Sequence, residues 1–73
     1  MDFTIQYYAR FDRLIFEERV EAEALTDVLD RARLIVSESG PDPDPHIDEL
    51  RLMGYVVLDS RGRQVARSYR RDA

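Results

Sequence analysis

Apolar and polar residues alternate along the first part of the chain, which predicts two strands joined as a hairpin. One face of the first strand would carry Phe3, Ile5, Tyr7, Ala9 and Phe11. The alternation continues beyond residue 13, with Leu14, Phe16, Val20 and Ala22 on one face. A period of two over this length is typical of half-buried strands.

A two-residue loop at Asp12-Arg13 gives this hairpin a consistent register, with Ile5 opposite Val20. The exception is Glu18, which would meet Tyr7 on the apolar face. Because Asp-Arg lacks the glycine that a tight type I′ turn favours, a bulge or a longer loop is the alternative, and it could turn Glu18 outward.

The next segment has the periodicity of a helix, predicted over residues 24–38. Its apolar residues recur at steps of three and four and so share one stripe: Leu25, Val28, Leu29, Ala32, Ile35 and Val36. Gly40 and Pro41 are typical of a helix end. A longer helix beginning near Leu14 is disfavoured, because the alternation through Val20 and Ala22 is too regular.

A proline-rich linker over residues 39–46 separates the helix from a second predicted hairpin over residues 48–70. Residues 45–53 fit either a short helix or the start of a strand that alternates through Leu58, and we favour the strand. Ser60, Arg61 and Gly62 would form the hairpin loop, with glycine in the left-handed position. That register places Val57 opposite Val65 and Met53 opposite Tyr69.

The predicted order is ββαββ in one α+β domain, an antiparallel sheet of about four strands with one helix packed on one face. A chain of 73 residues buries a small core, and chains of this size are often stabilised by self-association. We therefore expect a homodimer.

Two surfaces are predicted to bind a protein partner. The sheet face away from the helix would be apolar and aromatic, with Tyr8, Met53, Tyr55, Val57, Val65 and Tyr69. An acidic surface would combine Glu17, Glu21, Asp27 and Asp30 with Leu34 as an apolar anchor. The alternative for each is a solvated surface without a partner.

Charge and composition narrow the functional classes. The net charge is −4, the pI is about 4.8, and all eleven basic residues are arginine. An RNA or single-stranded DNA surface of tyrosines and arginines such as Arg67 is an alternative, although the negative charge disfavours it. No membrane partner is expected, because no segment reaches the length of a membrane span, and the first residues do not resemble a signal peptide. We expect a cytoplasmic protein.

No catalytic, cofactor or metal site is expected. The chain has no cysteine, and His46 is its single histidine, beside Asp48 and Glu49. A metal site needs three or four convergent ligands, so a solvated loop histidine is the simpler interpretation. The sequence motifs of phosphate-binding loops, nucleotide-binding folds and hydrolases do not occur. We therefore do not expect an enzyme.

Three segments carry a resemblance to known proteins: Phe3-Thr4-Ile5 before a hairpin, Val20-Glu21-Ala22-Glu23-Ala24-Leu25 entering a helix, and Asp59-Ser60-Arg61-Gly62-Arg63 at a second hairpin. In this order the chain resembles small ββαββ proteins of unassigned function and some compact phage proteins, among them certain anti-CRISPR inhibitors. The resemblance lies in topology and transfers no functional residues. It implies a protein that binds another protein, with carboxylates that take the place of nucleic-acid phosphates.

Overall fold

The computed structural model describes residues 1–38 and 52–69 of the chain. In sequence order these form β1 (Asp2–Ala9), a short turn η1 (Arg10–Asp12), β2 (Arg13–Glu21), α1 (Leu25–Glu38), β3 (Gly54–Leu58) and β4 (Gln64–Tyr69). The predicted linker and most of the segment that fits either helix or strand lie outside the described residues. Leu52 and Met53 precede the strand, so β3 begins at Gly54.

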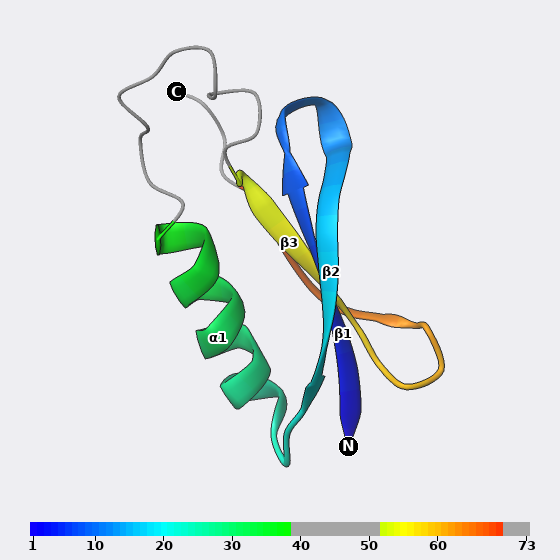
Figure 1. Ribbon diagram of the computed structural model, residues 1–73. Coiled ribbons are helices and arrows are strands. Elements are labelled where there is room, and N and C mark those ends of the chain that lie inside the picture. The colour runs from blue at the N-terminus through cyan, green and yellow to red at the C-terminus, as the bar shows by residue number, and fades with distance from the viewer. Residues whose placement is uncertain (39–51, 70–73) are drawn as a thin grey trace.

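The strands form one antiparallel sheet in the order β2-β1-β3-β4, and α1 lies along one of its faces (Figure 1). This arrangement confirms the predicted α+β class and the ββαββ order. The first strand of the sequence is central, and β2 and β4 are the two edges.

The core fills the space between α1 and the two central strands. Phe3, Ile5 and Tyr7 of β1 face it, together with Tyr55 and Val57 of β3. From the helix come three residues of the predicted stripe, Val28, Ala32 and Val36. Burial of such side chains stabilises the fold by roughly 1.5–3 kcal/mol each.

The first hairpin differs from its predicted register by two residues. The turn centres on Phe11 and Asp12, which have φ values of 60° and 55°, and the Arg13 N–H donates to the Arg10 carbonyl. Val20 lies opposite Phe3 instead of Ile5, and a bulge follows where Tyr7 pairs with Phe16 but Tyr8 with Leu14. The alternative of a bulge is therefore the correct one, but the bulge does not turn Glu18 outward: Glu18 lies opposite Ile5 and stays on the α1 side of the sheet.

The loop of the second hairpin forms as predicted, with Gly62 at a φ of 80°. Asp59 closes it, because its Oδ1 accepts hydrogen bonds from the N–H groups of Arg61 and Arg63, both at 2.9 Å. These bonds, the one from Arg63 foremost, hold the pKa of the Asp59 carboxyl below its ordinary value.

The pairing beyond this loop differs from the prediction by one residue. Val57 lies opposite Ala66 and Gly54 opposite Tyr69, with a bulge between Val57 and Leu58. The predicted faces of β3 are also wrong, because β3 pairs with β1 so that Val57 lies opposite Ile5 and Tyr55 opposite Tyr7. Tyr55 and Val57 therefore face α1, and Val56 and Leu58 face away from it.

Candidate interaction site

The sheet has one face that no described element covers, and we call it the open face. On β1 and β3 the residues of this face alternate with the core residues, and the residues paired with them on β2 and β4 share the face. The open face thus contains Thr4, Gln6, Tyr8, Leu14, Glu17, Arg19, Val56, Leu58, Arg67 and Tyr69. Apart from Leu58, which lies opposite Thr4, its apolar members gather near the β1–β2 turn, where Tyr8 pairs with both Leu14 and Gly54, and Gly54 pairs with Tyr69. A hollow here is lined in part by Tyr8, Val56, Arg67 and Tyr69.

Tyr69 extends from edge strand β4 to central strand β1. Its hydroxyl donates a 2.8 Å hydrogen bond to the backbone carbonyl of Ala9, although Tyr69 pairs with Gly54 of the intervening strand β3. A Cβ built on Gly54 would lie 2.8 Å from the Tyr69 Cα and 2.9 Å from its Cδ2, and closer still to the Ser68 carbonyl oxygen. The absence of a side chain at position 54 therefore lets the tyrosine ring pass over β3 and fixes its place on the open face.

A second tyrosine on this face is also held by its hydroxyl. Tyr8 donates to the Gln6 Oε1 at 2.9 Å, and the Gln6 Nε2 donates to the Glu17 Oε2 at 3.2 Å. This row of side chains runs from β1 onto β2 and ends in a carboxylate. The open face is thus apolar with fixed aromatic rings at one end, and it becomes polar towards β2.

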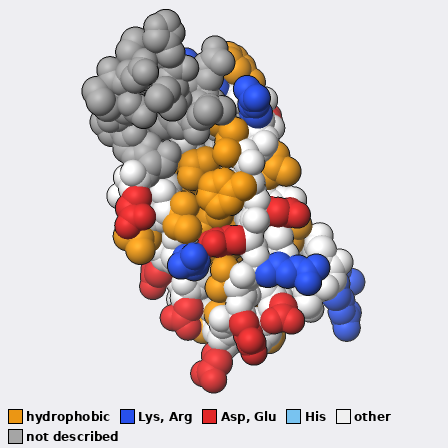
Figure 2. Space-filling view, viewed as in Figure 1, with side chains coloured by type: hydrophobic (Ala, Val, Ile, Leu, Met, Phe, Trp, Pro, Cys, Tyr) orange, Lys and Arg blue, Asp and Glu red, His pale blue; other side chains and the backbone are white. Residues whose placement is uncertain are grey.

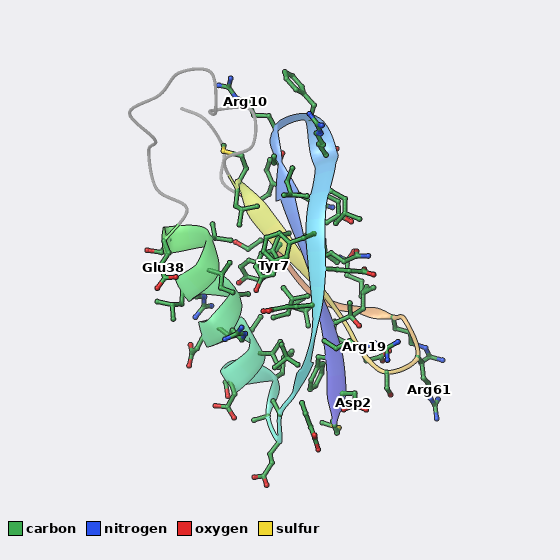
Figure 3. The ribbon with its side chains drawn as sticks, viewed as in Figure 1. Asp2, Tyr7, Arg10, Arg19, Glu38 and Arg61 are labelled. Atoms are coloured by element: carbon green, nitrogen blue, oxygen red, sulfur yellow. The ribbon has the colours of Figure 1, made fainter. Side chains whose placement is uncertain are left out.

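The other face of β2 is attached to the helix by an ion pair. Glu18 accepts two hydrogen bonds from Arg31 of α1, at 2.8 and 3.1 Å, and a third from the Tyr7 hydroxyl at 2.9 Å. Tyr7 itself lies between the sheet and α1 (Figure 3) and stacks on Phe16 with a ring-centroid distance of 4.6 Å. This network explains how Glu18 can stay on the face that the alternation predicts to be apolar.

The pKa values of Glu18 and of Tyr7 are both shifted in this network. The hydrogen bonds from Arg31 first, and then the one from Tyr7, lower the pKa of the Glu18 carboxyl. Burial raises the pKa of the Tyr7 hydroxyl, and its hydrogen bond to Glu18 raises it further. Glu18 is therefore ionised and Tyr7 neutral at neutral pH, in the arrangement that the three hydrogen bonds need.

The predicted sheet-face residues divide into two groups. Tyr8 and Tyr69 lie on the open face as expected, and Val65 is 41% exposed. Met53, Tyr55 and Val57 are buried, at no more than 5% exposure, and so cannot reach a partner in this fold. The apolar residues of this face that the sequence does not predict are Leu14, Val56 and Leu58. The bulge in β2 brings Leu14 to this face, and the pairing of β3 with β1 places Val56 and Leu58 on it.

The predicted acidic residues do not form one surface. Glu17 lies on the open face, and Glu21, opposite Asp2, shares that side of the sheet. Asp27, Asp30 and Leu34 belong to α1, on the other side, and all three are exposed. Figure 2 shows charged side chains of both signs over the part of the molecule farthest from the grey residues, and apolar side chains exposed between α1 and β2.

Residues 1–38 and 52–69 contain no group of three or more histidine, aspartate or glutamate side chains that could hold a metal ion. Over the same residues, the helix is too short and too polar to cross a membrane.

Comparison of the chain with protein-family models, with curated proteins and with solved structures found no match. The class of the protein therefore follows from its fold and surfaces alone. It is a small α+β domain in which one helix covers one face of a four-stranded antiparallel sheet, and nothing in residues 1–38 and 52–69 covers the other face.

Proposed function

We propose that this chain is a small, non-enzymatic protein-interaction module, which binds a protein partner through the open face of its sheet. The observation that carries the proposal is the apolar group of Tyr8, Val56 and Tyr69 on a face that no described element covers. In a small monomer, a grouped apolar surface of this kind typically marks an interaction site.

The chemistry of the group supports a protein partner. Tyrosine and arginine are enriched at the energetic centres of protein interfaces, and Arg67 lies among the two tyrosines and Val56. Both tyrosine hydroxyls already have hydrogen-bond acceptors, at 2.9 and 2.8 Å. Because the rings are ordered before binding, less side-chain entropy is lost when a partner covers them.

Affinity capture with a variant series tests this proposal. The wild-type domain and Val56→Glu are compared, and Asp30→Arg on α1 is the matched control, because it also changes an exposed charge but lies away from the open face. We expect wild type and Asp30→Arg to capture the same partner in stoichiometric amounts. Val56→Glu should capture at least tenfold less of it. If the captured proteins are the same for all three, the open face is not the binding surface.

The same variants separate the protein partner from a nucleic acid. An RNA or single-stranded DNA surface would bind oligonucleotides at low salt, and Arg67→Glu would weaken that binding, since phosphate contacts release counterions. We expect no oligonucleotide binding, because Glu17 lies on the open face and the net charge is −4. Salt-sensitive binding that depends on Arg67 would reassign the face to nucleic acid.

A second candidate function is inhibition of a nucleic-acid-binding protein through the outer side of α1. The observation that favours it is Leu34, which is 56% exposed one helical turn from Asp30, with Asp27 on the same side. Asp27→Arg with Asp30→Arg should slow association with such a partner, and Leu34→Glu should speed dissociation. Unchanged rates in both variants would leave α1 with a solvated surface only.

A further inference from the structure

Edge strand β2 has a row of backbone groups that point away from the sheet. Met1 and Ala22 exchange two backbone hydrogen bonds, of 3.0 and 3.1 Å. Hydrogen-bonded pairs alternate along an antiparallel ladder, so Phe3 with Val20 and Ile5 with Glu18 are also such pairs. The N–H and C=O groups of Glu17, Arg19 and Glu21 therefore face the free edge.

Nothing in the described part of the chain occupies this edge. The strand is nine residues long, contains neither proline nor lysine, and is last in the sheet order. Long edges of this kind are templates for pairing with another strand unless charge or a bulge prevents it. The bulge of β2 lies at its turn end, beside Tyr7 and Tyr8, and the segment from Phe16 to Glu21 pairs regularly with β1.

The side chains of this regular segment are complementary to themselves. We propose that β2 pairs antiparallel with β2 of a second copy of the chain, about a two-fold axis at Glu18. Glu17 then lies opposite Arg19 of the second copy, and Arg19 opposite its Glu17. These are outward-facing residues, so each such pair would exchange two backbone hydrogen bonds.

On the α1 side of the sheet the same register joins apolar residues. Phe16, which is 42% exposed in the single chain, meets Val20 of the second copy, and Val20 meets its Phe16. Covering Phe16 in this way extends the stack that it forms with Tyr7. Figure 2 shows apolar side chains exposed between α1 and β2, where the second copy would lie.

At the axis the two Glu18 side chains approach each other, and the structure contains the groups that offset this repulsion. Each carboxylate is bound by its own Arg31 through two hydrogen bonds and by its own Tyr7. These contacts also draw the carboxylate towards α1 and away from the axis.

Neighbouring registers are less favourable. A shift of two residues in one direction places the two Glu17 side chains opposite each other and brings the bulged residue Ile15 into the pairing. The shift in the other direction opposes the two Arg19 side chains and places Glu17 against Glu21. Like charges directly opposite destabilise a sheet. A shift of one residue would place outward-facing backbone groups of one copy opposite inward-facing groups of the other. It would also bring together side chains that belong to opposite faces of the two sheets.

In the proposed dimer both copies of α1 lie on the same side, and the two sheets become one. The interface uses the edge of β2 and leaves the apolar group of Tyr8, Val56 and Tyr69 uncovered, so it is independent of the function proposed above. The open faces of the two copies would be continuous across the axis, available to the same partner.

Charge exchange across the axis tests the register. Wild type, Glu17→Arg and Arg19→Glu are compared by sedimentation velocity over a micromolar to near-millimolar series, with Asp27→Arg as a control for an equal charge change on α1. We expect wild type and Asp27→Arg to dimerise, and each β2 variant alone to associate roughly tenfold more weakly, because each places like charges in both charge pairs.

Mixing the two β2 variants provides the decisive result. The guanidinium introduced by Glu17→Arg would lie opposite the carboxylate introduced by Arg19→Glu, so a mixture should form heterodimers at concentrations where each variant alone is mostly monomeric. Circular dichroism of each variant confirms folding before mixing. A wild type that stays monomeric at the highest concentration, β2 variants that dimerise like wild type, or a mixture that does not associate would each overturn the proposal.

Discussion

Glu18 is a carboxylate whose place in the fold depends on two side chains from other elements. Arg31 and Tyr7 supply all three of its hydrogen bonds, so its charge is stabilised on the side of the sheet that packs against the helix. Removing a partner from such a group costs more than the bond itself contributes, because the remaining polar atoms lose their contacts.

The stability of the fold should therefore depend on pH through Glu18. Its pKa is lowered in the folded state, so its contribution is fully present above the ordinary value of about 4.5 and is lost as the pH falls through the folded value. Glu18→Gln should lower the free energy of unfolding at pH 7 by about 1 kcal/mol, a modest amount because the Arg31 side chain is 50% exposed.

Urea unfolding measured between pH 7 and pH 3 checks this expectation. The difference between wild type and Glu18→Gln should shrink as the pH falls below about 4.5. Glu21→Gln is the matched control on the same strand, since Glu21 has no such partners among the described residues. An equal pH dependence in all three proteins would show that the Arg31 pair contributes nothing.

Gly54 is the position where a single methyl group should have the largest effect for its size. Gly54→Ala places a Cβ against the backbone of β4, which must move, and it displaces the Tyr69 ring. We expect a loss of about 2 kcal/mol in the free energy of unfolding. Gly62→Ala is the control: its Cβ meets nothing within 4 Å, so it costs only the left-handed conformation, about 1 kcal/mol. Equal losses would contradict the packing of Tyr69 over Gly54.

The η1 turn, which joins β1 to β2, is locally strained. Phe11 and Asp12 are consecutive residues in the left-handed region, which favours glycine and asparagine, and Phe11 is 94% exposed and so gains little from packing.

Phe11→Asn together with Asp12→Gly should therefore raise the free energy of unfolding by about 1 kcal/mol, because Asn-Gly adopts this turn with little strain. Thermal unfolding followed by circular dichroism measures the gain. Phe11→Leu is the control, since leucine has the same left-handed cost as phenylalanine. A double variant no more stable than Phe11→Leu would mean that the turn is not strained.

The same turn shows why the sequence predicts the elements better than their pairing. The alternation through Ile5 and Tyr7 and the stripe through Val28, Ala32 and Val36 correctly give one face of β1 and of α1, since each depends on residues within one element. Register depends on how many residues the turns and bulges consume. The pattern indicates that a bulge is possible in the first hairpin but does not locate it, and it does not mark the bulge in the second hairpin.

The candidate site differs most from its prediction in β3, where Val56 and Leu58 take the place of Tyr55 and Val57 on the open face. The pairing of β3 with β1 decides which face is open, and the alternation within β3 fits either face. Tyr8 and Tyr69 were placed correctly. The sequence predicts that Glu18 meets Tyr7, but it does not predict the contact of Glu18 with Arg31, because the pattern does not contain the position of α1 relative to β2.

For the whole molecule, protection from hydrogen exchange should follow the sheet order. Amides of β1 and β3 should exchange slowest, because both strands are central and both contribute to the core. On β2, the amides of Glu18 and Val20 should be protected in dilute protein, and those of Glu17 and Arg19 should not. Exchange measured by NMR at increasing concentration should slow at Glu17 and Arg19 if the edge pairs with a copy. Slow exchange at these two amides at every concentration would contradict a free edge.

The central place of β1 also has a kinetic consequence. The strand that is made first can pair with β2 at once, but its other neighbour, β3, follows only after the helix and the segment beyond it. Loop closure over such a separation is entropically costly and slows folding. During synthesis, the ribosome would therefore release the hairpin and the helix well before Ile5 can meet Val57, and the nascent chain must remain unassembled until its last strands emerge.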